Sequence, residues 1–370
     1  MKGREKMVQL TADIVRPSEL TSAEREAWRS FVRARPELKS PFFQLEFTDS
    51  AAEVVPGSQV AVLHAGGEVK GFFPFQRRGP TVYPLGAPLN DYHSTITSPD
   101  VSIDPYDLMR LLAAPSIAAT GWVGPPPASD FKTSNAVAAD LSSGWEAYDE
   151  QQRQQWRRFF GDKDRARRSL ARDMGPVATI IDPVTDQKNL DRLVDLKRRQ
   201  YARSGRHDIF ACGWTMDLLR ILAYRSTPEF GATLVVLMAG DEVAALEFSL
   251  YSGTQHHFWF PAYEASAARY SPGILLSLDT MKHFSREGRT QFDFGVEGEP
   301  YKKYFCDKQT TVAEFSLHST ELRQSLQSLV TQSRFGQSVM RRWSVIDGCE
   351  TSARGRLAGI GAAAFAMIPR

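Results

Sequence analysis

The chain has 370 residues, 42% of them hydrophobic and 24% charged, with a formal net charge of +2. This length suits two packed domains, and the near-neutral charge gives no overall signal for a nucleic-acid partner. No stretch reaches the ~18 apolar residues that cross a bilayer, and the N-terminus has no apolar signal core. We therefore expect a cytoplasmic protein.

The three cysteines, Cys212, Cys306 and Cys349, lie far apart in the sequence. They form no C-x-x-C pair and no metal-ligand spacing, which is typical of proteins from a reducing compartment. The sequence also has no Gly-x-Ser-x-Gly pattern of a serine nucleophile. We expect no bound metal.

Two segments in different halves of the chain look alike, residues 58–75 (SQVAVLHAGGEVKGFFPF) and 232–250 (ATLVVLMAGDEVAALEFSL). Each has an apolar run, a tight turn with Gly-Gly or Gly-Asp, and a second run, which predicts a β-hairpin. Their similarity is consistent with an internal duplication. Because hairpins are common, a chance similarity is an equally open alternative.

The second hairpin is followed by a regular series of elements. Residues 255–263 read as a third strand, and a helix is expected from Pro272 to about Glu287, ended by Gly288. In residues 291–298 Phe and Val alternate with Asp, Gly and Glu, which predicts a strand with one face in the core. The order of strand, helix and strand predicts a mixed α/β fold, with the helix start at the strand ends, a usual place for a ligand.

The start of that helix, Ser271-Pro272-Gly273, has two interpretations. Ser could cap a core helix with Pro at its first position. Alternatively, the N–H groups of Gly273, Ile274 and Leu275, with the Ser271 hydroxyl, could bind an anion. The first half of the chain has no comparable helix start after its hairpin.

Four further stretches carry a resemblance to a known family: SPFFQLEF near residue 40, PLNDYHSTI near 90, YSPGILLSL at 270–278 and FDFGVEGEPYKKYF at 292–305. In this order they resemble the CelD/BcsL branch of the GNAT acyltransferases, tandem-GNAT proteins linked to bacterial exopolysaccharide synthesis, such as cellulose or holdfast-like polymers. The same stretches also show a distant resemblance to Fem-type aminoacyl transferases.

The resemblance implies a tandem GNAT fold with mixed central sheets flanked by helices. We expect a degenerate GNAT-like domain at 1–145, a basic linker helix at 146–175, a GNAT domain with an acyl-CoA site at 176–318, and a basic appendix at 319–370. The co-substrate would be acetyl-CoA.

The resemblance also assigns the acyl-CoA site. The family holds the CoA diphosphate on a glycine-rich turn, which here corresponds to Arg269 through Ile274 and includes Tyr270, with Gly273 as its single glycine. The pantetheine would lie between strands 255–263 and 291–298, where Trp259, Phe260 and Tyr263 could line the slot. Core packing is the equally open alternative for these aromatic residues.

Amine acylation needs a base for the ammonium and an acid for the leaving thiolate. Glu247, in the middle of a strand, is the first candidate base, with a solvent-facing position as the alternative; Asp293 is the second. Tyr301 matches the family's proton-donating tyrosine. Lys302 matches the lysine of its Tyr-Lys motif, for substrate phosphate or an oxyanion, unless it lies on a solvated face.

The acceptor is expected to meet a segment of the first half, Asp91, Tyr92 and His93, which matches the family. The neighbours His256 and His257 should face opposite sides of a strand. We therefore expect no metal pair there, and assign His257 to the acceptor cleft.

Two basic segments remain. Residues 151–172 hold eight Arg or Lys against two Asp, either as a solvated helix face or to attract an anionic, nucleotide- or lipid-linked sugar. In the appendix, Arg341, Arg342 and Trp343 could grip a guanine nucleotide such as cyclic di-GMP. Its apolar end, residues 357–368, could dock on the protein or on the inner membrane surface.

Together these features favour an N-acetyltransferase that acts on a sugar of exopolysaccharide synthesis. Two alternatives stay open. One is a non-catalytic GNAT-fold scaffold or nucleotide sensor, and the other is Fem-like aminoacyl transfer from tRNA, against which the modest net charge argues weakly.

Overall fold

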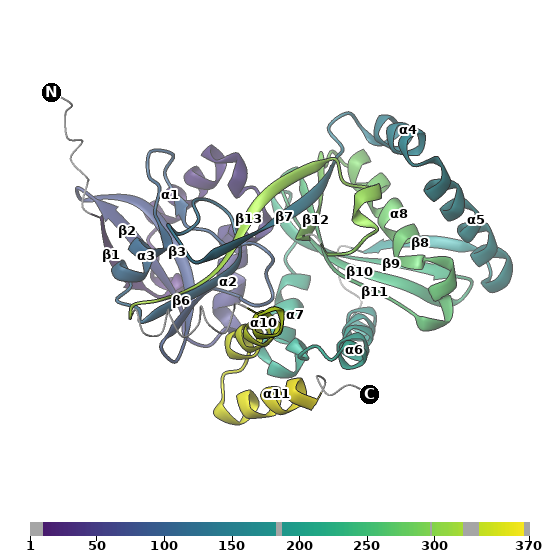
Figure 1. The fold of residues 1–370 in the computed structure, drawn as a ribbon. Coiled ribbons are helices and arrows are strands. Elements are labelled where there is room, and N and C mark those ends of the chain that lie inside the picture. The colour runs from purple at the N-terminus through teal and green to yellow at the C-terminus, as the bar shows by residue number, and fades with distance from the viewer. Residues whose placement is uncertain (1–9, 183–186, 297, 321–332, 366–370) are drawn as a thin grey trace. The chain divides into compact units, whose positions relative to one another are not determined.

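The computed structural model describes residues 10–182, 187–296, 298–320 and 333–365, and the chain divides into two compact units (Figure 1). Each unit is assembled from separate segments of the chain. Unit 1 comprises residues 1–133, 211–218 and 312–370, and unit 2 comprises residues 134–210 and 219–311.

Unit 1 is built on a mixed sheet with the strand order β1-β2-β3-β4-β6-β13, and β5 pairs with β3. Neighbouring strands are antiparallel except for β4 and β6. The elements are β1 (Leu10–Val15), α1 (Ser22–Ala34), α2 (Leu45–Val54), β2 (Ser58–Ala65), β3 (Glu68–Arg78), β4 (Thr81–Pro84), β5 (Ile96–Thr97), α3 (Pro105–Leu111), β6 (Ser116–Trp122), β13 (Lys308–His318), α10 (Arg334–Cys349) and α11 (Ala353–Phe365).

In the described residues, unit 2 contains the strands in the order β7-β12-β11-β10-β9-β8 of the same 13-stranded sheet, and among them only β11 and β12 are parallel neighbours. Helices α8 and α6 pack on this sheet from its two sides (Figure 1). The elements that lie wholly or partly in unit 2 are β7 (Phe131–Asp140), α4 (Trp145–Gln155), α5 (Arg157–Met174), β8 (Val177–Asp182), α6 (Gln187–Ser204), α7 (Trp214–Ala223), β9 (Phe230–Ala239), β10 (Glu242–Ser252), β11 (Gln255–Tyr263), α8 (Pro272–Arg286) and β12 (Gln291–Val296).

Both predicted hairpins are present, as β2–β3 and β9–β10. Gly66, Gly67 and Gly240 at their turns have positive φ angles, which a glycine adopts without steric cost. The third strand and the helix after it are also confirmed. Helix α8 ends at Arg286, and Gly288 follows at φ 88°, as the C-terminal signal predicted.

The expected domain boundaries differ from the compact units. The basic segment 146–175 forms α4 and α5 within unit 2, because Phe160 and Leu170 of α5 are buried in its core. Likewise, the described part of the expected appendix belongs to unit 1, where Tyr83 Oη donates to Asp347 of α10 at 2.9 Å.

A disulfide joins Cys212 and Cys349 in unit 1, which the interpretation of the cysteines as typical of a reducing compartment did not anticipate. The two residues are 137 positions apart, and the contact arises only because residues 211–218 pack beside the end of α10. The indole of Trp214 reinforces this contact by donating to the Cys349 carbonyl at 2.9 Å.

Within the described residues, every helix is too short or too polar to cross a bilayer. The apolar end predicted at 357–368 lies partly outside the described residues. On its described part, helix α11 exposes Leu357 and Ile360.

Candidate active site in unit 2

Strands β11 and β12 diverge after a short paired segment. They pair in parallel over three positions only, ending with His257 opposite Asp293. Beyond that point β11 continues to Tyr263, whereas Val296 of β12 pairs with Ala136 of β7 on its other side. The two strands therefore form a wedge that is open toward the start of α8.

The aromatic residues expected to line this wedge have different surroundings. Trp259 and Phe260 are buried, and their rings pack on Phe248 and Phe210 with centroids 6.2 and 5.5 Å apart. Tyr263 is instead 53% exposed. Core packing thus accounts for the first two aromatic residues, and Tyr263 remains available to a ligand.

Helix α8 begins with an unusual backbone conformation. Ser271 is left-handed, with φ 53° and ψ 49°, and its side chain makes no capping hydrogen bond. The N–H groups of Ile274 and Leu275 donate to the Ser271 carbonyl at 3.0 and 3.2 Å. Of the three predicted N–H donors, only that of Gly273 has no described protein acceptor, so the prediction was wrong for the other two.

A lysine that the sequence analysis did not single out lies at this helix start. Lys163 of α5 donates from Nζ to Ser271 Oγ at 2.9 Å, and its ammonium lies 5.1 Å from the Phe159 ring centroid. The helix start thus combines an N–H group, the positive end of a helix dipole and a fixed cation, which together favour an anion. The charge density of residues 151–172 was the only sequence signal for it.

Tyr270 and Gly273 have distinct roles in this turn. The buried Tyr270 ring anchors the turn, because its hydroxyl donates to Asp173 at 2.8 Å. Gly273 has room around it, since a Cβ built there would meet only Tyr263 Cδ1, at 3.9 Å. Because glycine has no side chain, the approach to the helix start is open at Gly273.

Glu247 is fully buried and not solvent-facing. It accepts hydrogen bonds from Ser249 at 2.6 Å and from Thr280 of α8 at 3.3 Å. Burial raises the pKa of this carboxyl to about 8, so the group is mostly protonated at neutral pH.

The nearest titratable partner of Glu247 is His256, whose Nε2 lies 3.5 Å from Glu247 Oε1. The imidazole stacks between Phe284 and Phe292, with centroids 4.4 and 4.8 Å away. Its burial lowers the pKa of His256 well below the ordinary value. The two groups thus form a neutral buried pair, which the sequence analysis missed because it considered this histidine only as a metal ligand.

Asp293 lies on the opposite face of the sheet from Glu247. Its carboxylate accepts from Gln255 Nε2 at 2.9 Å and from the Gly295 N–H at 2.7 Å, and His257 Nδ1 lies 3.6 Å away. As expected, His256 and His257 face opposite sides. The face of β12 that carries Asp293 is also buried, with Asp293 only 5% exposed, and Glu297 lies outside the described residues.

Tyr301 and Lys302 follow β12. Burial, together with the negative charges of Glu299 and Glu247, raises the pKa of Tyr301, which keeps it a proton donor. Lys302 is buried, donates to the Val296 carbonyl at 2.8 Å and pairs with Glu299 at 2.9 Å. Its ammonium therefore holds the loop after β12 and does not lie on a solvated face.

The segment Asp91, Tyr92 and His93 belongs to unit 1. Tyr92 is buried against Phe42, and His93 is 2% exposed with Nδ1 beside the Thr120 carbonyl. Burial lowers the pKa of His93 to about 4. Two of the three residues thus contribute to the core of unit 1, and Asp91 is half-buried.

Comparison with known proteins concerns the segment that contains the wedge. Residues 157–303 match the family described as an acetyltransferase (GNAT) domain. This segment is therefore similar to GNAT acetyltransferase domains. Domains of this family generally use acetyl-CoA or another acyl-CoA, and the mixed α/β fold agrees with the prediction. No protein of curated function matches the chain in sequence.

Three solved structures resemble the chain at low sequence identity. A tandem GNAT protein from the clavulanic acid biosynthesis pathway is 10% identical, with a TM-score of 0.49 over 84% of this chain and 99% of that one. FemX is 10% identical, with a TM-score of 0.48 over 86% and 99% of the two chains. L-PGS from Bacillus licheniformis is 10% identical, with a TM-score of 0.45 over 85% and 96%.

The raised pKa of Glu247 makes a prediction about stability. The native state retains a proton that the unfolded chain releases near the ordinary pKa of 4.5, so the free energy of unfolding should fall as pH rises from there to about 8. The slope should reach at most about 1.4 kcal/mol per pH unit. Glu247→Gln should abolish this contribution. The free energy of unfolding of the variant should therefore rise relative to that of the parent as the pH increases through this window.

Urea unfolding of parent and variant at several pH values measures the effect. The matched control is Glu242→Gln, an exposed glutamate at the start of the same strand. Parallel stability curves for the parent and the Glu247 variant would show that the carboxyl titrates normally.

Proposed function

We propose that unit 2 transfers an acyl group, namely acetyl, from CoA to an amine. The observation that supports this best is the wedge between β11 and β12, which opens beside the Lys163–Ser271 contact at the start of α8. The diphosphate would accept from the Gly273 N–H and Lys163, while the pantetheine enters the wedge between the two strands.

The chemistry needs two proton movements. The amine nitrogen attacks the thioester carbonyl, the C–S bond breaks, the nitrogen loses a proton and the thiolate gains one. Tyr301, with its raised pKa, is the proposed donor to the thiolate, and the unprotonated fraction of Glu247 is the proposed base. Because Glu247 is fully buried, its proton would arrive over a bridging hydroxyl or water.

For the acceptor we propose an amino sugar on a nucleotide or lipid diphosphate, used in exopolysaccharide synthesis. Support comes from the resemblance to the CelD/BcsL proteins and from α5, whose exposed Arg157, Arg158 and Arg168 make no ion pair among the described residues. Such a helix favours an anionic substrate by long-range attraction.

The donor site can be tested at Gly273. Gly273→Glu should place a carboxylate near the diphosphate and weaken CoA binding by roughly tenfold or more, since like charges at short range repel by more than 1 kcal/mol near a protein surface. Gly273→Gln, of equal size and without charge, is the control. Calorimetry with CoA measures both. Equal CoA affinities of the parent and the Gly273→Glu variant would contradict a diphosphate site at this helix start.

The chemical roles can be tested by turnover once thiol release identifies an acceptor. Glu247→Gln should lower kcat by about 10²–10⁴-fold, the usual contribution of a positioned base, and leave CoA affinity unchanged. Tyr301→Phe should lose less, because water can replace the acid. Full turnover of the Glu247 variant would make Glu247 structural and leave Asp293 as the candidate.

A second candidate function concerns unit 1 and a guanine nucleotide, including cyclic di-GMP. A pocket of about 310 Å³ there is lined by Arg341, Trp343, Phe131 and Lys132, among others. Trp343 and Phe131 are 39% and 38% exposed, and Arg341 lies 3.7 Å from Glu314. Exposed aromatic rings beside cations suit base stacking and phosphate binding.

This candidate is tested by titrating GTP and cyclic di-GMP into the parent and into Trp343→Ala. We expect the variant to bind at least about tenfold more weakly, because stacking on one aromatic ring contributes about 1–3 kcal/mol. The control is Tyr224→Ala, an exposed aromatic residue of unit 2. Equal binding by both variants would exclude this pocket.

A further inference from the structure

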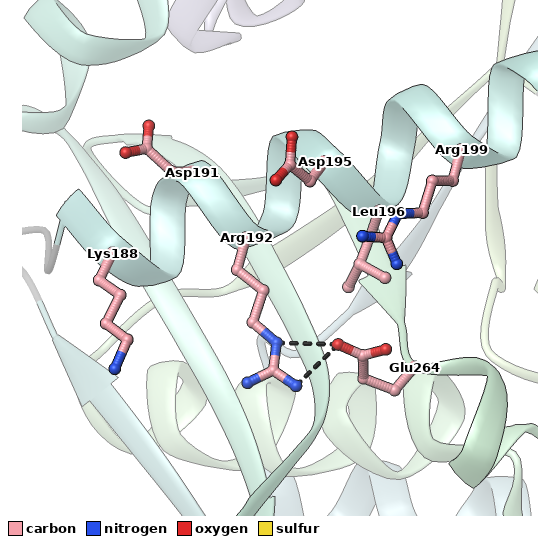
Figure 2. Close-up of a pocket in the computed structure, with 7 residues that line it drawn as sticks. All are labelled: Lys188, Asp191, Arg192, Asp195, Leu196, Arg199 and Glu264. Atoms are coloured by element: carbon pink, nitrogen blue, oxygen red, sulfur yellow. Dashed lines mark hydrogen bonds and ion pairs between the residues drawn. The ribbon is translucent and has the colours of Figure 1, made fainter.

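A charged pocket of about 520 Å³ lies along α6 in unit 2 and is distinct from the wedge (Figure 2). Its residues on α6 recur every three or four positions and so occupy one face of that helix. One more residue comes directly after β11. The lining consists of Lys188, Asp191, Arg192, Asp195, Leu196, Arg199 and Glu264.

The cations of this pocket gather on the side where Glu264 lies. Figure 2 shows Lys188, Arg192 and Arg199 extending from α6 toward that side, whereas Asp191 and Asp195 point away. The lining as a whole holds three cations and three carboxylates, and the three cations are grouped around Glu264. Such a local group of cations favours an anionic ligand.

The Glu264 carboxylate is held by one of these cations. Arg192 Nε and Nη2 lie 2.8 and 2.7 Å from Glu264 Oε1. The Arg192 and Glu264 side chains are 36% and 22% exposed. A partly solvated ion pair of this kind contributes little to stability. A ligand with more negative charge than a carboxylate can therefore displace Glu264.

Arg199 supplies a second guanidinium. It is exposed, and the described part of the chain offers it no ion-pair partner. A guanidinium matches the oxygens of a phosphate with two parallel hydrogen bonds.

One residue of the pocket is adjacent in sequence to the proposed donor site. Glu264 directly follows Tyr263, whose ring would meet a Cβ at Gly273 at the start of α8.

We propose that the pocket binds a phosphate group through Arg192 and Arg199, and that Glu264 is the internal competitor that the phosphate displaces. The group could belong to CoA, as its 3′-phosphate, or to a phosphorylated acceptor. Binding itself needs no acyl transfer, but the two sources follow from the proposed function.

The test is calorimetry with inorganic pyrophosphate, performed in the Gly273→Glu background so that the helix-start site is blocked. The double variant Arg192→Gln/Arg199→Gln should bind pyrophosphate roughly tenfold or more weakly than this background. The charge-matched control is Arg198→Gln/Arg203→Gln, which removes two arginines of the same helix outside the pocket. Glu264→Gln should bind more tightly than the background, by about threefold or more.

The last result distinguishes a ligand site from a structural ion pair, which would gain no affinity when its acid is neutralised. Equal losses in the two double variants, unchanged or weaker binding by Glu264→Gln, or no binding up to roughly 10 mM pyrophosphate would overturn the proposal. Thermal unfolding of each variant checks that it is folded.

The source is then identified in the parent with an intact Gly273. If the phosphate is that of CoA, the parent should prefer CoA to dephospho-CoA, and the Arg192/Arg199 variant should lose this preference. If it belongs to the acceptor, both forms of CoA should bind equally to parent and variant, and the variant should raise only the KM of the acceptor. Loss of CoA binding in Gly273→Glu, by contrast, reports on the helix-start site alone.

Discussion

The divergence of β11 from β12 is the constraint on which the proposed site depends. Parallel strands normally continue their ladder, because unpaired backbone groups are costly in the interior. Here β12 pairs with β7 on its other side at Val296, while β11 continues to Tyr263 paired with β10 only. The edges that face each other across the wedge are therefore available to a ligand that can itself donate and accept hydrogen bonds, as the amides of a pantetheine do.

Helix α5 fixes the open end of this wedge. Lys163 reaches Ser271, and Arg167 one turn later pairs with Asp279 at 2.7 Å, so two contacts hold α5 against α8. On its inner face α5 buries Phe160 and Leu170. The cation at the helix start is thus positioned by the same packing that stabilises the domain, which makes its geometry independent of a ligand.

The neutral pair of Glu247 and His256 shows a tension between stability and function. A carboxyl with no exposed surface lowers stability when it ionises, and apolar residues would fill the same space at lower cost. Hydroxyls of Ser249 and Thr280 satisfy the carboxyl only in part, because the surrounding aromatic rings offer no further donors. A cost of this kind is expected where a perturbed pKa serves chemistry.

The sequence by itself determined the local elements of unit 2. Turn glycines, apolar periodicity and helix caps located the β9–β10 hairpin, β11, α8 and the alternation of β12, because each signal acts between residues a few positions apart. It also located the start of α8 and the segment around Glu247, since a carboxylate within an apolar strand can be recognised from the sequence alone.

Only the tertiary structure decided which groups meet. The contacts of Lys163 with Ser271, of Cys212 with Cys349 and of Arg192 with Glu264 join residues 108, 137 and 72 positions apart. The same holds for the units, whose segments return to each other from distant parts of the chain. Burial of Lys302 and the orientation of Trp259 follow from packing against such distant neighbours, and no pattern along the sequence encodes which of many compatible partners a side chain will contact.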